Sequence, residues 1–320
     1  VGDTVVVERA GDVIPHVISV DKKKRKADSK KYIFPEKCPC GFKVIKDYNK
    51  ITKKFDDAEY IKIDQDILCK NLLRKNDLDD GRITIDYYKL SNKAQLNYLN
   101  EDSDISWIQI LSGGIKATES DFNKDQIVLI KGKREIQLST SRDTELAITK
   151  INNYKIFESD ASDVFDSQIN IINWGNEPIL KSEHDDRKRV YLLSELLAGT
   201  DSVKGELIIY PKNTSCPEHY HVGAQHYQLI TEGEVIAVLD GKETKLEKYD
   251  VLYNFENEPH WFYTNEKSCD FVEFFVPGEN KTVWTKTTNV CTWSPMGVDI
   301  NGQSPSRHIE KHVHGEGKNI

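Results

Sequence analysis

The chain has 320 residues, of which 30% are charged and 38% hydrophobic, and its formal net charge is −8. This length allows two or three domains, each large enough to bury a core. The negative charge disfavours strong non-specific nucleic-acid binding by the whole chain, and no apolar run approaches the roughly 20 residues that cross a bilayer. Six cysteines are too few for the disulfide framework of a small secreted domain. We therefore expect a cytoplasmic protein with free thiols and no membrane contact.

Residues 1–58 predict a small β-rich segment. Runs of β-branched residues at 5–7 and 17–20 flank an Ala-Gly-Asp turn. The stretch GDTVVVERAGDVIP, a basic run and then FPEKCPCG resemble the oligonucleotide-binding (OB) fold and the start of the zinc finger of bacterial NAD-dependent DNA ligases. The resemblance implies that Arg9, Val13 and Ile14 would contact a DNA backbone.

This ligase-like segment departs from the ligases in two ways. Cys38 and Cys40 are separated by one residue, whereas a tetrahedral zinc site usually begins with two cysteines separated by two or more, and only Cys69 follows before Cys216. The sequence also lacks the nucleotidyl-transfer domain with its lysine nucleophile. We therefore predict neither a closed zinc finger nor ligase activity, and interpret the segment as a relic or a borrowed module.

The remaining sequence predicts connecting structure followed by two β-barrels. Residues 59–100 are charged and mixed, and we expect a linker with short helices near 67–74 and 93–99. Short strand-like runs separated by glycine turns cover 101–165 and recur with better definition over 166–300. No histidine occurs between His16 and His184, so we expect a degenerate first barrel without a histidine metal site. Residues 301–320 are expected to form a tail.

The pair His219 and His221 is the strongest chemical signal. Histidines two residues apart on a strand point to the same face, so both imidazoles can reach one ion. The surrounding PEHYHVGAQHYQLITEG resembles the first metal-binding motif of cupins, and His260 fits the histidine of the second motif. The resemblance covers residues 195–280. It implies an all-β bicupin, with cupin (double-stranded β-helix or jelly-roll) barrels preceded by the OB-like segment.

The cupin motif has a glutamate where this chain has Gln225 or His226. Alternation along a strand puts Gln225, Tyr227 and Leu229 on one face, so Gln225 points into the barrel if Leu229 does, and His226 points away. Tyr227 and Gln225 are then the predicted catalytic residues, because a phenol can act as acid or base and an amide can orient a bound water. The predicted metal ligands are His219, His221, His260 and Gln225.

Three neutral imidazoles without a carboxylate leave a metal ion its full charge, which favours an anionic substrate or bound hydroxide. Such a site resembles the three-histidine iron dioxygenases among cupins. We expect a divalent metal ion, with Fe(II) preferred over Zn, Mn or Ni, a small organic substrate and a homodimer. The alternatives are a cupin lyase or isomerase, a non-catalytic cupin that binds a small ligand, and nucleic-acid association through the ligase-like segment. The histidines near the chain end, His308, His312 and His314, are interpreted as part of a solvated tail.

Overall fold

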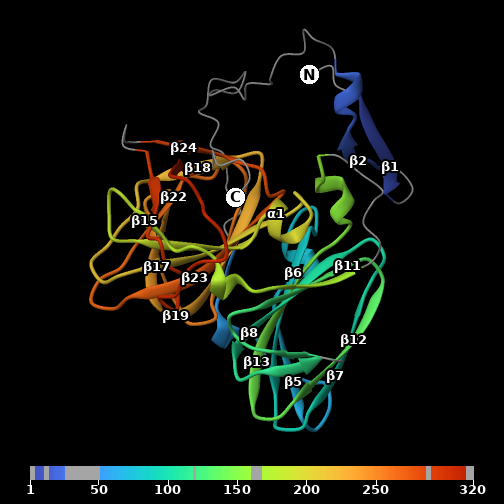
Figure 1. Cartoon of the computed structure of the whole chain (residues 1–320). Coiled ribbons are helices and arrows are strands. Elements are labelled where there is room, and N and C mark those ends of the chain that lie inside the picture. The colour runs from blue at the N-terminus through green and yellow to red at the C-terminus, as the bar shows by residue number, and fades with distance from the viewer. Residues whose placement is uncertain are drawn as a thin grey trace. The chain divides into compact units, whose positions relative to one another are not determined.

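The computed structural model describes residues 4–10, 14–25, 51–117, 120–159, 168–285 and 290–314. The chain divides into two compact units, Val1–Tyr48 and Asn49–Ile320. The described part of the first unit is an antiparallel hairpin of β1 (Val5–Ala10) and β2 (Ile14–Val20), followed by a short 3-10 helix, η1 (Lys22–Lys24) (Figure 1). Arg9 lies on β1 and Ile14 on β2. Val13, Cys38 and Cys40 lie outside the described residues.

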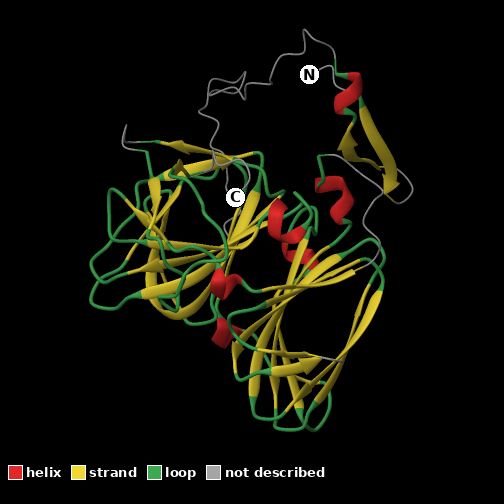
Figure 2. Cartoon of the chain, viewed as in Figure 1, coloured by secondary structure: helices red, strands yellow, loops and turns green. Residues whose placement is uncertain are grey.

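The second unit begins with a β-barrel made of two antiparallel sheets (Figure 2). Apolar residues alternate with polar ones along several strands, so the sheets enclose a core that includes Ile108, Ile136 and Leu138. The seven-stranded sheet has the order β14-β11-β8-β13-β6-β5-β4 and the four-stranded sheet the order β10-β9-β12-β7. The strand bounds are β4 (Ile61–Lys62), β5 (Ile67–Leu73), β6 (Ile83–Leu90), β7 (Gln95–Asn100), β8 (Ile105–Ser112), β9 (Ile115–Ala117), β10 (Ser120–Phe122), β11 (Ile127–Lys131), β12 (Arg134–Thr140), β13 (Thr144–Ile151) and β14 (Gln168–Ile172).

The expectation of a helical linker over residues 59–100 is wrong. The two segments expected to be helical form the strands β5 and β7, and this region supplies four strands to the first barrel. The alternation of buried residues breaks down in β5, where Leu72 and Leu73 are both buried because a bulge between Asn71 and Leu73 shifts the pairing with β6 by one residue. The short 3-10 helices of the first barrel and of the link to the second are η2 (Phe55–Asp57), η3 (Lys75–Asp77), η4 (Tyr154–Phe157) and η5 (Trp174–Asn176).

A second barrel follows, built on one sheet that curls so that its strands enclose a second core (Figures 1 and 2). Its single short helix in the described residues is α1 (Glu195–Ala198), which Ser194 caps and Gly199 ends. The strands of this sheet are β3 (Ile51–Lys53), β15 (Leu180–Ser182), β16 (Lys188–Leu193), β17 (Lys204–Tyr210), β18 (His219–Val222), β19 (Gln225–Leu239), β20 (Lys242–Glu247), β21 (Val251–Asn254), β22 (His260–Tyr263), β23 (Cys269–Val276), β24 (Lys281–Trp284), β25 (Thr292–Pro295) and β26 (His312–Val313).

The long strand β19 belongs to both halves of this barrel. Its first half pairs with β21 and β23, and its second half pairs with β20 and β22. Between the halves the register shifts at Ile230–Glu232, and Gly233 follows with a φ of +74°. A Cβ at Gly233 would lie 1.9 Å from the backbone oxygen of Ser268. The close approach of β19 to the start of β23 therefore requires glycine at this position.

The two barrels share a large apolar core. Trp107 of β8 contacts Phe274 of β23 with ring centroids 4.7 Å apart, and Tyr227 and Leu229 of β19 lie in the same cluster. The strand β3, which precedes the first barrel in sequence, pairs with β21 of the second barrel. Beside this strand, Lys54 forms an ion pair of 2.6 Å with Asp250. Each barrel thus buries one of its sides against the other barrel.

Within the described residues, no helix has the length and apolar character that would let it cross a membrane. The described cysteines are all buried and free. Cys69 belongs to β5 of the first barrel, where its side chain is 4% exposed.

Candidate metal centre

Four histidines from three strands of the second barrel converge in its interior. His219 and His221 come from β18, His226 from β19 and His260 from β22. His219 and His260 are direct cross-strand partners with ring centroids 4.6 Å apart. The ring of His226 lies 4.7 Å from that of His221 and 4.8 Å from that of His260. The strand pairing therefore gathers all four imidazoles at one place.

Three of these histidines present a buried ring nitrogen without a hydrogen-bond partner. These atoms are Nε2 of His221, Nδ1 of His226 and Nε2 of His260. A buried polar atom without a partner costs about 1–3 kcal/mol, and such atoms are rare in folded proteins. One ligand atom each from His221, His226, His260 and Glu273 lies within 4.8 Å of the others. The donor set and its unpartnered nitrogens fit a divalent metal ion.

The opposite ring nitrogens are held by neighbouring groups. His219 Nδ1 donates to the carbonyl oxygen of Pro217 and His260 Nδ1 to that of Glu258, both at 2.8 Å. This leaves Nε2 of both rings unprotonated, because a neutral imidazole carries one hydrogen. His226 Nε2 lies 3.3 Å from a carboxylate oxygen of Glu273 and 3.3 Å from the amide nitrogen of Asn254. Such outer partners orient the histidines of metal sites and fix their tautomers.

Burial keeps the cluster uncharged. It lowers the pKa of His219 to about 4 and the pKa of His260 to about 3. Burial, together with the neighbouring imidazoles, also lowers the pKa of His221 and His226 well below 6.5. At neutral pH all four rings are neutral, which is the form that binds a metal ion.

The expectation that Gln225 faces this cluster and His226 does not is wrong. His226 lies in the cluster, whereas the Gln225 amide oxygen accepts a hydrogen bond of 2.5 Å from Tyr253. Tyr227 is on the same face of β19 as Gln225, and it lies in the core between the barrels, where its hydroxyl hydrogen-bonds Thr149 at 2.8 Å. Leu229 is in that core as well. Because β19 is buried on both faces, apolar residues could not identify the face that lines the barrel.

Because Tyr227 lies in the core between the barrels, we expect its substitution to change stability but not metal binding. Replacing it in Tyr227→Phe removes the hydrogen bond to Thr149 and should reduce the free energy of unfolding by about 1 kcal/mol. Metal content should stay the same, because the hydroxyl lies away from the histidines. Urea unfolding and elemental analysis of the purified variant check both points, with Thr149→Val as the partner substitution. Loss of metal in Tyr227→Phe would restore the catalytic role expected from the sequence.

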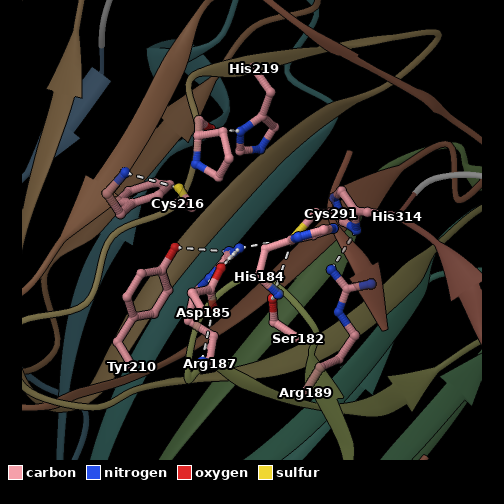
Figure 3. A network of polar contacts seen from close by, with 12 residues as sticks. Ser182, His184, Asp185, Arg187, Arg189, Tyr210, Cys216, His219, Cys291 and His314 are labelled. Carbon is pink, nitrogen blue, oxygen red and sulfur yellow. Dashed lines mark hydrogen bonds and ion pairs between the residues drawn. The ribbon is translucent and has the colours of Figure 1, made fainter. Parts of the chain in front are cut away.

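A small cavity of about 30 Å³ opens beside His219 and has two buried arginines in its wall. Arg187 forms two hydrogen bonds with Asp185, of 2.9 and 2.8 Å, and one of 3.3 Å with the hydroxyl of Tyr210 (Figure 3). Arg189 forms an ion pair of 2.8 Å with Glu206. The cavity also has apolar and thiol walls; the lining residues include Cys216, Phe262, Phe271, Cys291 and Trp293. A molecule of only a few non-hydrogen atoms fits this space.

The chain end adds His314 to the site, and the expectation that this histidine lies in a solvated tail is wrong. His314 is 7% exposed, lines the cavity and has a ring nitrogen within 4.8 Å of one from His219 and one from His221. Just before it, β26 pairs with β25, and His312 Nε2 lies 2.8 Å from the hydroxyl of Tyr191. The tail is therefore packed up to His314. The second His-x-His pattern, at 312 and 314, was the signal that could have found it.

Comparison with protein families matches residues 206–276 to the cupin domain. This stretch contains the four clustered histidines. Residues 206–276 thus form a cupin domain whose histidine cluster is suited to a metal ion.

Sequence comparison finds relatives of the N-terminal segment among DNA ligases. The chain is 75% identical over 57 residues to the DNA ligase of Pelagibacter ubique and 54% identical over 59 residues to that of Agrobacterium fabrum. In both cases the match covers 18% of this chain and 8% of the ligase. The chain thus spans less than a tenth of the curated relatives that it matches, and the ligase-like start is confirmed.

Structure comparison finds a bicupin enzyme. A deletion mutant of Bacillus subtilis oxalate decarboxylase superposes with a TM-score of 0.59 at 11% identity, over 76% of this chain and 80% of that one. A tryptophan-to-tyrosine variant of the same enzyme gives a TM-score of 0.58 at 12% identity, with the same shares covered. A third structure of that enzyme is described for its Mn(II) centres. At this identity the likeness confirms the all-β, two-barrel cupin fold.

Proposed function

We propose that the second barrel binds one divalent metal ion through its histidine cluster and acts as a metal-dependent oxygenase on a small anionic organic molecule. The observation that carries the proposal is the set of unpartnered, buried ring nitrogens of His221, His226 and His260, with His219 beside them. An imidazole cluster of this kind is destabilising unless something binds it. A metal ion satisfies all of these atoms at once.

The charges around the cavity favour an anion. The two arginines of the wall are each matched by one carboxylate, Asp185 or Glu206. The histidines are neutral, so an ion that they hold keeps its double positive charge. Burial also raises the pKa of Glu273 to about 8, which reduces the negative charge that this residue contributes at neutral pH. An anionic substrate would balance the positive charge of the bound metal ion.

The imidazoles outnumber the single carboxyl group, Glu273, in the donor set, which favours iron over manganese. Imidazole suits iron, copper, nickel and zinc, whereas carboxylate and carbonyl oxygens suit manganese, magnesium and calcium. In this chain His226 occupies the position where the cupin motif has glutamate. Replacement of the carboxylate by an imidazole shifts the preference toward Fe(II), the ion that we propose.

When bound, the ion would supply redox chemistry with oxygen and a positive charge at the substrate. The chain's own residues bind and orient the reactants. Phe262, Phe271 and Trp293 make part of the cavity wall apolar, which keeps water from the reacting atoms. Arg187 is fixed by Asp185 and Tyr210, so its guanidinium is a rigid positive group at the cavity. The small cavity limits the substrate to a short acid or a similar anion.

Elemental analysis of the full chain, followed by oxygen-electrode measurements on a series of short carboxylic acids, tests the proposal. We expect about one iron per chain and substrate-dependent oxygen uptake. His221→Ala should lose both, because it removes a ligand. A metal-free wild-type protein, or an iron protein that consumes no oxygen with any acid of the series, would contradict the oxygenase.

A cupin lyase is the second candidate. The fold likeness to oxalate decarboxylase, a protein studied for its Mn(II) centres, favours it. This candidate predicts manganese in the purified protein and release of carbon dioxide from a short dicarboxylic acid without net oxygen consumption. The same two measurements therefore separate the oxygenase from the lyase.

A further inference from the structure

His314 is held at the cavity by a chain of buried polar groups. Its backbone N–H donates to the carbonyl oxygen of Cys291 at 2.9 Å, which continues the pairing of β26 with β25. Its ring nitrogen Nδ1 contacts the guanidinium of Arg189 (Figure 3). Arg189 is in turn held by Glu206, and the side chains of this ion pair are 2% and 0% exposed. The ring of His314 is therefore held in one orientation.

The contact with Arg189 fixes the tautomer of His314. A guanidinium has only donors, so Nδ1 of His314 must accept the hydrogen bond and carries no hydrogen. The single hydrogen of the neutral ring is then on Nε2. A protonated Nε2 cannot bind a metal ion, but it can donate a hydrogen bond.

His314 lies where such a donor would meet a substrate. It lines the same cavity as His219, and its ring centroid is 6.1 Å from that of His219 and 5.5 Å from that of His221. Its neighbours in the cavity wall include Arg187 and Trp284. An anion bound in the cavity beside His219 would therefore lie close to this ring.

We propose that His314 donates a hydrogen bond from Nε2 to the anion held at the metal, with Arg189 and Glu206 setting its tautomer. His314 is then a substrate-binding residue supplied by the chain end, outside both cupin motifs, and not a metal ligand. The inference rests on the proposed function, because it needs a metal ion at the four histidines. It also restricts the substrate, which must place a negatively charged hydrogen-bond acceptor next to the metal ion.

The test uses the full chain loaded with Co(II), whose visible absorption reports ligand binding, and azide as the probe anion. His314→Ala should bind Co(II) as the wild type does but bind azide about 10- to 100-fold more weakly, the loss expected for one hydrogen bond to a charged group. His314→Gln, which keeps an N–H donor at a similar reach, should recover part of the azide affinity. His308→Ala is the matched control, since His308 belongs to the same tail and is exposed.

Two results would overturn the inference. If His314→Ala binds Co(II) much more weakly or changes its spectrum without azide, His314 is a metal ligand. If azide affinity is the same in His314→Ala and His308→Ala, the ring does not contact the anion. A wild-type chain that binds no Co(II) would instead refute the metal site itself, so the two failures are distinguishable. Circular dichroism of each variant establishes that it is folded before titration.

Discussion

His226→Ala is expected to weaken divalent metal binding by about 100-fold or more, whereas Gln225→Ala should leave it unchanged. His226 presents an unpartnered Nδ1 to the cluster, while the Gln225 side chain bonds to Tyr253. Loss of a group that only orients a ligand costs about 10- to 100-fold in metal affinity, so loss of a ligand should cost at least as much. Isothermal titration of the metal-free protein with Fe(II) or Co(II) measures both variants.

His226→Glu sharpens this test. It restores the carboxylate of the cupin motif at the same position, and the variant should bind metal again with a preference moved toward manganese. If Gln225→Ala loses metal and His226→Ala keeps it, β19 presents its other face to the ion and the assignment of the four-histidine site fails.

Gly233→Ala is expected to destabilise the protein by about 3 kcal/mol or more. The new Cβ would lie 1.9 Å from the backbone oxygen of Ser268, and the residue would keep a φ of +74°, which is unfavourable for alanine. This clash can be relieved only if β19 moves away from the start of β23, with which it pairs. Chemical denaturation of the metal-free variant measures the change.

Gly241→Ala is the matched control for this substitution. Gly241 has a similar φ of +70°, but nothing lies within 4 Å of the position of its Cβ. It should therefore cost only the backbone penalty, about 1–2 kcal/mol. Equal losses for the two variants would mean that the close approach of Ser268 adds nothing.

Motif spacing alone located three of the four clustered histidines. His219 and His221 share one face of β18 because they are two residues apart, and His260 lies opposite His219 because β22 pairs with β18. The fourth, His226, was missed because the orientation of β19 depends on what covers each face. The first barrel packs against one face, and nothing local in the sequence records that contact.

Two other errors have a similar physical origin. The bulge in β5 interrupts the alternation of buried and exposed residues that marks a strand, and only the partner strand β6 reveals the break in register. His314 lies in the cavity because β26 pairs with β25 and Arg189 holds its ring. Both depend on residues distant in the sequence, whereas composition and local pattern describe only neighbours. The all-β fold with two barrels was predictable because its alternation and glycine turns are local.

The pairing of β3 with β21 affects both the order in which the second barrel can fold during synthesis and the place where the chain can be truncated. A ribosome releases Ile51–Lys53 about 200 residues before their partners at 251–253, so this edge of the second barrel can be completed only by a segment synthesised long before. Contacts of such long sequence separation slow folding. A fragment that starts after the first barrel would leave β21 with an unpaired edge, which favours association with other chains. To produce the second barrel, the chain should therefore be cut before Asn49, at the boundary between the two compact units.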